Sequence, residues 1–433
     1  MARCVRLHPI AIALSFTGLC VNLPAEGQSL PASLVRYRVV PIREGLASGA
    51  AAVNDTGQVV GSYSMVFNTE AFVWENGSLV TLPRGTFDNA TATDINEAGV
   101  IVGQVSESGL FAARSAVRWT NSGGTWSGAT LDSGRSAAAL GDQNLIVGTK
   151  CNDILCLSHN GFIRYPDDST VFVPPFADGQ DNNNAFGIND LLVGFGGAVV
   201  GSGQASDGSN RALFYTLPLF FLFSSVDLGV LPPTGDDVIP QSVAYDLNNQ
   251  LPPIIVGSSD TGVVGETLPV VWTGAVPSTI RSLGTFGGPR GEALAVNDWG
   301  WVVGWAQDAA GEDRAFLVED VDQPELIDLN DTVPCDTTVT LRFAVDINDE
   351  GWIAGTADDN GQDVAFLLIP HPAGDCDDSG TADPNDVAAF SACRTAPGVP
   401  VSVECRCFDL DCSGSVDLRD FAFLQRTFGI AFP

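Results

Sequence analysis

Short runs in which apolar and polar residues alternate recur between about residues 35 and 370, with turn-forming residues between them. In the clearest unit, residues 293–304, the run Ala-Leu-Ala-Val precedes the turn Asn-Asp-Trp-Gly, and Trp-Val-Val-Gly follows it. Alternation with a period of two is typical of half-buried strands, and Asn-Asp-x-Gly favours a tight turn between them. Such units recur 42 to 56 residues apart and end at Gly61, Gly103, Gly148, Gly201, Gly257, Gly304 and Gly355.

Further short apolar runs follow these units, such as Ala71–Trp74 and Leu79–Leu82. Four short strands per repeat, at a period of about 40–55 residues, is typical of a β-propeller blade. The pattern therefore predicts an all-β fold, a seven-bladed β-propeller over residues 35–370. The last repeat stops after its third strand, at Ile369–Pro370, and Tyr37–Ile42 before the first repeat offers a fourth. We expect this N-terminal strand to close the last blade.

The repeats resemble the bacterial extracellular HAF repeat family over most of residues 37–370, at the Asn-Asp-x-Gly and Ala-Phe-x-Trp motifs. The resemblance implies a propeller-like fold and brings no enzymatic activity common to the family. Asparagine is a frequent turn former, so the repeated asparagines are expected to shape turns rather than to form a catalytic ring. These residues are Asn54, Asn96, Asn189, Asn248, Asn297 and Asn348.

Tryptophans fall into two groups. One recurs in the third strand of a repeat and is expected to lie in the blade cores. The other clusters round a single turn, where other repeats carry small or polar residues, and is a candidate sugar-binding platform. The first group is Trp74, Trp119 and Trp272, and the second is Trp299, Trp301 and Trp305.

Two twelve-residue acidic segments, residues 375–386 and 409–420, follow the repeats. Each carries oxygen-bearing side chains at positions 1, 3, 5, 9 and 12 and a glycine at position 6, which is the ligand spacing of an EF-hand calcium loop. Calcium prefers six to eight oxygen ligands, and the glycine permits the sharp turn that points them inward. The predicted metal ligands are Asp375, Asp377, Ser379, Thr381, Asp383 and Asp386 in the first loop, and Asp409, Asp411, Ser413, Ser415, Asp417 and Asp420 in the second.

A helix is expected after each loop. Asp383 and Asp417 are suited to cap these helices, with Asp386 and Asp420 in their first turns, where negative charge is favourable. Apolar residues at helical spacing follow, and Gly429 ends the second run. The stretch before the first loop predicts strands and turns instead, so the unit is a loop followed by a helix, present twice.

This tail resembles the dockerin module over residues 373–430, in a divergent bacterial form with additional cysteines. The resemblance implies two calcium sites and a pair of helices that dock onto a cohesin domain of another protein. The recognition positions late in each loop, Pro384–Asn385 and Leu418–Arg419, do not match each other. The partner is therefore left as a cohesin-like protein or another surface protein.

The N-terminus has the three-part layout of a secretory signal peptide, with arginines at 3 and 6, an apolar stretch from Ile10 to Leu23 and small residues near Gly27. We expect cleavage after about residue 27 and a secreted protein without a membrane span. The apolar run Leu217–Phe223 is too short to cross a bilayer and predicts a buried strand. A formal net charge of −32 disfavours binding to nucleic acid or anionic membranes.

Eight of the ten cysteines lie beyond residue 27, an even number that favours disulfides in an exported chain. Cys151 and Cys156 are close enough in sequence to pair across a turn. Several pairings remain open in the tail: Cys376 with Cys412, which would join the two loops, and Cys393 with Cys405 or Cys407. Zinc is an alternative use of these cysteines, although the mature chain has only two histidines and no paired Cys-x-x-Cys spacing.

Two functions of different class fit these features. The chain lacks the common nucleophile, zinc-protease and phosphate-loop motifs, and its two mature histidines make a Ser-His-Asp site improbable. The first hypothesis is a non-catalytic binding or scaffold protein whose tail attaches it to a partner. The second is a glycoside hydrolase or lyase acting on polysaccharide, carried to an assembly by its tail. A unique pair of acids at one mouth of the ring would favour the enzyme.

Overall fold

The computed structural model describes residues 35–42, 47–109, 113–131, 136–153, 156–176, 182–190, 197–216, 225–235, 237–275, 279–377, 379–395, 399 and 401–429. The predicted signal peptide, residues 1–27, and the predicted strand at residues 217–223 lie outside this part of the chain. No helix within the described ranges is long and apolar enough to cross a membrane.

Strands that follow one another in the chain pair antiparallel, so each repeat builds its own antiparallel ladder. Across the described residues the strands form five four-stranded sheets and one eight-stranded sheet. The first two four-stranded sheets contain β2 (Ser48–Val53), β3 (Val59–Ser64), β4 (Thr69–Glu75) and β5 (Ser78–Thr81), then β6 (Asn89–Ile95), β7 (Ile101–Ser106), β8 (Arg114–Ser122) and β9 (Thr125–Leu131). The next two contain β10 (Ser136–Leu140), β11 (Ile146–Cys151), β12 (His159–Arg164) and β13 (Thr170–Phe172), then β14 (Asn183–Ile188), β15 (Ala198–Gln204), β16 (Asn210–Thr216) and β17 (Ser225–Asp227).

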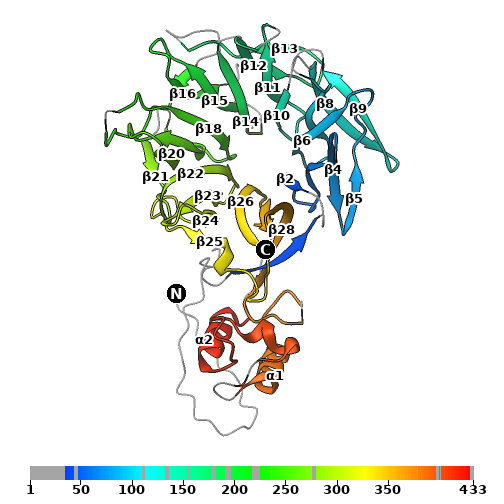
Figure 1. The fold of residues 1–433 in the computed structure, drawn as a ribbon, viewed down its shortest axis with the longest axis vertical. Coiled ribbons are helices and arrows are strands. Elements are labelled where there is room, and N and C mark those ends of the chain that lie inside the picture. Colours follow the sequence, from blue (N-terminus) through cyan, green and yellow to red (C-terminus); the bar gives the residue numbers. More distant parts are fainter. Residues whose placement is uncertain are drawn as a thin grey trace.

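The eight-stranded sheet consists of two antiparallel ladders, which a single parallel pair, Thr267 with Arg290, joins. Its strands are β18 (Ser242–Leu247), β19 (Ile255–Asp260), β20 (Thr267–Thr273) and β21 (Thr279–Ser282), then β22 (Gly287–Val296), β23 (Val302–Asp308), β24 (Asp313–Val318) and β25 (Ile327–Asp328). The short 3₁₀-helix η2 (Leu329–Asp331) leads from there to the last sheet. Figure 1 shows the sheets as sectors round a common centre, with β2, β14, β18, β22 and β26 among the strands nearest to it, which is the β-propeller architecture.

The last sheet joins the two ends of the ring. It consists of β26 (Thr340–Ile347), β27 (Ile353–Asp359) and β28 (Gln362–Pro372), followed in space by β1 (Val35–Pro41). β1 pairs antiparallel with β28 from Val35 opposite Pro372 to Pro41 opposite Phe366. The prediction that an N-terminal strand completes the last repeat is confirmed.

The glycine that ends each repeat unit is required by a close approach of two backbones. Each inner strand has a β-bulge opposite this glycine, as between Ala50 and Ala52 opposite Gly61. A Cβ atom on Gly61 would lie 2.1 Å from the carbonyl oxygen of Gly49, and one on Gly304 would lie 2.0 Å from that of Glu292. The same clash, at 2.0 to 2.1 Å, recurs at Gly103, Gly148, Gly201, Gly257 and Gly355.

Apolar side chains from neighbouring sheets pack against each other round the ring. Trp119 and Trp272 are fully buried and Trp74 is 7% exposed, so all three lie in the core as predicted. The indole N–H groups of the first two donate to backbone carbonyls, Trp119 to Pro83 over 2.7 Å and Trp272 to Leu228 over 2.9 Å. Each buried polar atom is thereby satisfied.

The tail contains α1 (Pro384–Cys393), the 3₁₀-helix η3 (Val403–Phe408) and α2 (Leu418–Thr427), and lies beside the ring next to the end of β28 (Figure 1). Its small core is built round Phe390, Phe408 and Leu424, each at most 2% exposed. Phe390 meets Phe408 edge to face at 5.7 Å between ring centroids. The loop–helix order predicted for both repeats of the tail is present.

One of the disulfides between described cysteines joins the tail to the ring. Among the described cysteines the pairs are Cys151–Cys156, Cys335–Cys412, Cys376–Cys407 and Cys393–Cys405. The alternative in which Cys376 and Cys412 join the two acidic loops is therefore not adopted. Cys335 lies in the ring, between η2 and β26, and its partner Cys412 lies in the second acidic loop.

Removal of the closing strand tests the ring. Deleting residues 35–43 exposes the edge of β28 and removes the seven residue pairs between β1 and β28. We expect the loss to lower the free energy of unfolding by several kcal/mol, since it combines lost burial with lost ladder hydrogen bonds. Thermal and urea unfolding followed by circular dichroism measure this. An unchanged transition midpoint would contradict closure by β1.

Candidate functional site

Each acidic loop gathers three carboxylates at one point. One side-chain oxygen each of Asp375, Asp377 and Asp386 lies within 4.8 Å of the other two. The second loop gives the same arrangement at the same positions, 1, 3 and 12, with the residues Asp409, Asp411 and Asp420.

The backbone of each loop folds round the carboxylate at position 1. Asp375 accepts from the backbone N–H of Ser379 over 3.0 Å and from that of Gly380 over 2.8 Å. Asp409 accepts in the same way from Ser413 and Gly414 over 3.0 and 2.9 Å. Both glycines have left-handed backbone conformations, with φ of 88° at Gly380 and 78° at Gly414, which side-chain-bearing residues rarely adopt.

Position 12 ties the start of the loop to the start of the helix. Asp386 accepts from the backbone N–H groups of Cys376 and Asp383 over 2.9 and 2.8 Å. Asp420 accepts from Leu410 and Asp417 over 2.7 and 2.8 Å. These bonds complete a capping box at each helix.

The other predicted ligands take different roles. The side chains of Asp383 and Asp417, at position 9, cap α1 and α2 and accept from the N–H groups of Asn385 and Arg419 over 2.7 and 2.8 Å. Positions 5 and 7 lie together, because the hydroxyls of Ser379 and Ser413 donate to the carbonyl oxygens of Thr381 and Ser415 over 3.0 and 3.2 Å. The structure thus brings positions 1, 3 and 12 together and uses position 9 as a helix cap.

The donor set fits a hard cation. Burial is the main cause that raises the pKa of Asp375, Asp409 and Asp420, and neighbouring carboxylates add to it. A bound cation would offset this repulsion. The cysteines of the loops, Cys376 and Cys412, are bonded to other cysteines, which removes them as thiolate ligands for zinc. Carboxylate, hydroxyl and carbonyl oxygens suit calcium instead.

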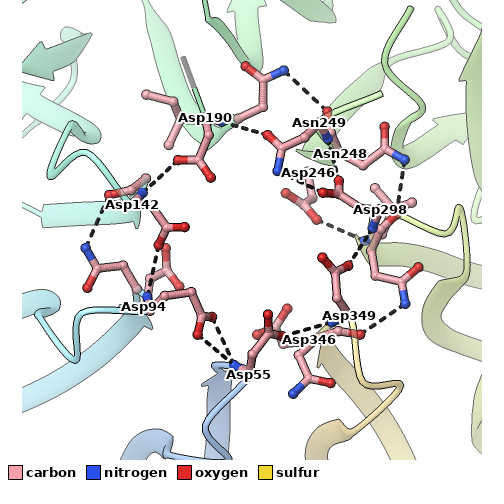
Figure 2. Close-up of a pocket in the computed structure, with 18 of the residues that line it drawn as sticks. Asp55, Asp94, Asp142, Asp190, Asp246, Asn248, Asn249, Asp298, Asp346 and Asp349 are labelled. Carbon is pink, nitrogen blue, oxygen red and sulfur yellow. Dashed lines mark hydrogen bonds between the residues drawn. The ribbon is translucent and has the colours of Figure 1, made fainter. Parts of the chain in front are cut away.

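A second polar cluster lines the centre of the propeller, where the Asn-Asp-x-Gly turns of the sheets meet (Figure 2). It encloses a cavity of about 210 Å³. Asn54 shapes its own turn by accepting from the N–H of Gln58 over 2.9 Å, and donates from Nδ2 to the carbonyl oxygen of Asn96 in the next sheet over 3.1 Å. At the other end of the chain, Asn348 donates to the carbonyl oxygen of Asn54 over 3.0 Å. The asparagines are turn formers, as predicted, and also join neighbouring sheets.

The residue after each turn asparagine, or after Gly141 in its place, forms a continuous ring of hydrogen bonds. Its backbone N–H donates to the side-chain oxygen of the equivalent residue in the next repeat, and the ring closes when Asp349 donates to Asp55 over 3.1 Å. The links run from Asp55 to Glu97, Asp142, Asp190, Asn249, Asp298 and Asp349, with distances of 2.7 to 3.0 Å. The sequence marks these acids as turn residues but does not show that they form one closed ring.

Three aspartates two residues before the turn lie on the wall of the same cavity, and the sequence analysis missed them. Asp94, Asp246 and Asp346 each accept from a backbone N–H of the next sheet, over 2.6, 2.9 and 2.8 Å. Burial, chiefly, raises the pKa of Asp246 to about 7 and that of Asp346 to about 6, and it raises the pKa of Asp94 well above its usual range. The available signal was that other repeats carry alanine or glycine there, such as Ala52 and Gly187.

The predicted tryptophan platform does not form. Trp301 is only 8% exposed, and a Cβ on Gly351 of the next turn would lie 3.2 Å from its ring, so it packs between sheets. Trp305 meets Phe343 edge to face at 5.7 Å between centroids. Trp299 alone of the three is exposed, at 54%, and its indole N–H donates to the carbonyl oxygen of Asp349 over 2.8 Å.

Comparisons with solved structures find β-propeller proteins. A mutant of puromycin hydrolase matches with a TM-score of 0.50 at 11% identity, over 76% of this chain and 52% of the hydrolase. The β-propeller domain of the Trilobed protease from Pyrococcus furiosus matches with a TM-score of 0.42 at 8% identity, over 66% of this chain and 84% of that one. TolB from Acinetobacter baumannii matches with a TM-score of 0.37 at 10% identity, over 72% and 79%. At these identities the likeness concerns the fold alone.

No protein-family model matches the chain. No curated protein matches it significantly either.

The three aspartates on the wall of the central cavity, Asp94, Asp246 and Asp346, predict that the stability of the protein depends on pH. Because their pKa values are raised in the folded protein, the charged form is disfavoured there. For Asp246 and Asp346, the contribution to stability is present below the unfolded pKa of about 4 and is lost as pH rises through about 6 to 7. Asp246→Asn keeps an oxygen that can accept from Val296 and removes the charge.

We expect Asp246→Asn to raise the free energy of unfolding at pH 8 by on the order of 1–2 kcal/mol, a value reduced because solvent in the central cavity screens the charge. At pH 4.5 the same change should alter the free energy of unfolding little. Urea unfolding in chelator at both pH values measures this, with Glu75→Gln as a control at an exposed acid. Equal effects of Asp246→Asn at both pH values would refute the assignment.

Proposed function

We propose that the chain is an exported, calcium-binding protein that does not act as an enzyme. Its tail is a dockerin-like module that attaches it to a partner protein, and its propeller, of the HAF-repeat type, mediates further contacts. The observation that carries the proposal is the pair of carboxylate clusters, each within 4.8 Å, at identical positions of two loop–helix units.

Two calcium ions are the proposed cofactors, one in each loop. In the first loop Asp375, Asp377 and Asp386 hold the ion, and Ser379 and Thr381 lie beside them. In the second loop the corresponding residues are Asp409, Asp411, Asp420, Ser413 and Ser415. The ion supplies positive charge among carboxylates that otherwise repel one another and whose burial raises their pKa. Asp383 and Asp417 act from position 9 as helix caps, so they support the loops from outside the carboxylate cluster.

The propeller is proposed to have seven blades. Five four-stranded sheets and an eight-stranded sheet built of two ladders support this count, as does the hydrogen-bonded ring of seven residues at the centre. Export is supported by the four disulfides between described cysteines, which are compatible with an oxidising compartment.

Exposed apolar side chains on the second helix support docking of the tail to a protein. Leu418 is 77% exposed at the first position of α2, and Phe428, just after its end, is 41% exposed. Large apolar residues left in water on a small module are typical of an interaction surface. The partner is a cohesin-like or other surface protein, and a carbohydrate remains a candidate ligand of the propeller.

The arrangement of the acids that line the central cavity supports binding rather than catalysis. A glycosidase needs two acids set apart from the rest by position and environment. Here acids from several sheets line the mouth together, and the side-chain oxygens of Asp55, Glu97, Asp142 and Asp190 are each occupied by a backbone N–H of a neighbouring sheet. Asp94, Asp246 and Asp346 differ from these acids by their raised pKa, but each also accepts from a backbone N–H and the three form no isolated pair, so a polysaccharide hydrolase or lyase is the less supported reading.

Calcium titration of the oxidised full chain tests the proposal, since Cys412 of the second loop is bonded to Cys335 of the ring. We expect two sites by titration calorimetry, and an increase in the free energy of unfolding of about 4 kcal/mol per site when calcium exceeds Kd a thousandfold. Changing Asp375 and Asp409 to Ala together should abolish both the heat and the stabilisation. A matched double change of two exposed propeller acids, Glu75 and Glu107, to Ala should preserve them. Absence of calcium binding in the wild type would refute the proposed function.

A further inference from the structure

The second acidic loop is held by the ring on both sides of one carboxylate, Asp411. On one side, the carbonyl oxygen of Leu410 accepts a hydrogen bond from the guanidinium of Arg36 in β1. On the other side, Cys412 forms the disulfide with Cys335. A salt bridge of 2.9 Å between Arg406 and Asp336 lies nearby.

Arg36 connects the tail to the strand that closes the ring. Besides its bond to Leu410, its guanidinium donates to the carbonyl oxygen of Asp331, in the segment that precedes the last sheet. The next residue of β1, Tyr37, donates its backbone N–H to the carbonyl oxygen of Thr332 over 2.9 Å. β1 is the edge strand of its sheet, with β28 as its neighbour, so these bonds add restraint to a strand with one free edge.

Leu410 and the peptide group that follows it link this arginine to the carboxylates, because the N–H of Asp411 also donates to Asp420, over 3.3 Å. The backbone N–H of Leu410 donates to Asp420 over 2.7 Å, while its carbonyl oxygen faces Arg36. A cation that fixes Asp420 and Asp411 therefore also fixes the peptide group that Arg36 holds.

The first loop has the same internal bond but meets the ring at β28 instead of β1: the N–H of Asp375 donates to the carbonyl oxygen of Pro372 over 3.1 Å, and the described residues show no bond from this loop to Arg36. The N–H of Cys376 donates to Asp386 over 2.9 Å, and Cys376 is bonded to Cys407 within the tail itself. The two loops thus share their internal hydrogen bond but differ in their contacts with the ring, so the first loop serves as a control within the same molecule.

We propose that calcium in the second loop locks the ring closed, through Leu410 and Arg36, by restraining β1 against β28. This inference rests on the proposed function, since it needs calcium to bind the loops. Binding restrains the segment 410–412, which lowers the entropy lost when Arg36 is held, and so favours the docked form of β1. Linkage is reciprocal, so an intact Arg36 contact strengthens calcium binding by the same factor.

Amide hydrogen exchange of the oxidised full chain, with calcium or chelator, tests the lock. We expect calcium to slow the exchange of β1 amides that face β28, such as Arg38 and Val40, by between about 5- and 150-fold, the usual range of coupling between two sites. Asp411→Asn should abolish this protection. Asp377→Asn, the same change at the same position of the first loop, should leave it in place.

A second pair of variants separates the contact from the ion. Arg36→Met should remove the calcium-dependent protection of β1 and weaken one of the two calcium sites by the same factor, as titration calorimetry would measure. Arg38→Met, at an exposed position of the same strand, should do neither. This arm keeps the test valid should Asp411→Asn fail to fold.

Two results would overturn the lock. If both sites bind calcium while β1 exchanges equally fast with and without it, the proposed function stands and the lock is wrong. If β1 protection responds to calcium equally in Arg36→Met and in the wild type, another contact is responsible. A wild-type chain that binds no calcium by calorimetry would remove the proposed function and the lock together.

Discussion

Closure of the ring is the constraint on which the rest of this structure depends. Each repeat has a main-chain N–H group at its inner turn, and this group donates to a side-chain oxygen of the next repeat. The series has no free end only because Asp349 donates to Asp55, across the junction between the last sheet and the first. That junction in turn exists because β1, from the start of the chain, is the outer strand of the last sheet. Main-chain hydrogen bonding therefore links both ends of the propeller sequence.

The tail is attached at this same junction. Arg36 of β1 contacts the second acidic loop, and Cys335, near the last sheet, is bonded to Cys412 of that loop. A module attached there adds restraint at the point where the two ends of the propeller sequence meet, in the pairing of β1 with β28. On the proposed function, calcium would order a small domain with little core of its own and would also bear on the stability of the larger one.

The sequence predicted the local features and missed those that depend on distant partners. Repeat spacing, the closing glycines and the helix-capping aspartates at 383 and 417 are local, because a strand period, a bulge or a capping box involves residues near one another. The pair Cys335–Cys412 spans 77 residues, and no spacing rule selects it over the alternatives. Trp301 looked like a surface residue because its turn is polar, whereas its burial comes from Gly351 of the next sheet. The raised pKa values of Asp94 and Asp246 likewise come chiefly from burial by parts of the chain that are distant in sequence.

The most direct test of the central claim is a crystal structure of the full oxidised chain grown with calcium, with anomalous scattering recorded to locate the ions. We expect one ion in each acidic loop, bound by the carboxylates of Asp375, Asp377 and Asp386 and by those of Asp409, Asp411 and Asp420, with the guanidinium of Arg36 still on the carbonyl oxygen of Leu410. Loops free of anomalous density at saturating calcium, or ions found only among the acids of the propeller channel, would contradict the account.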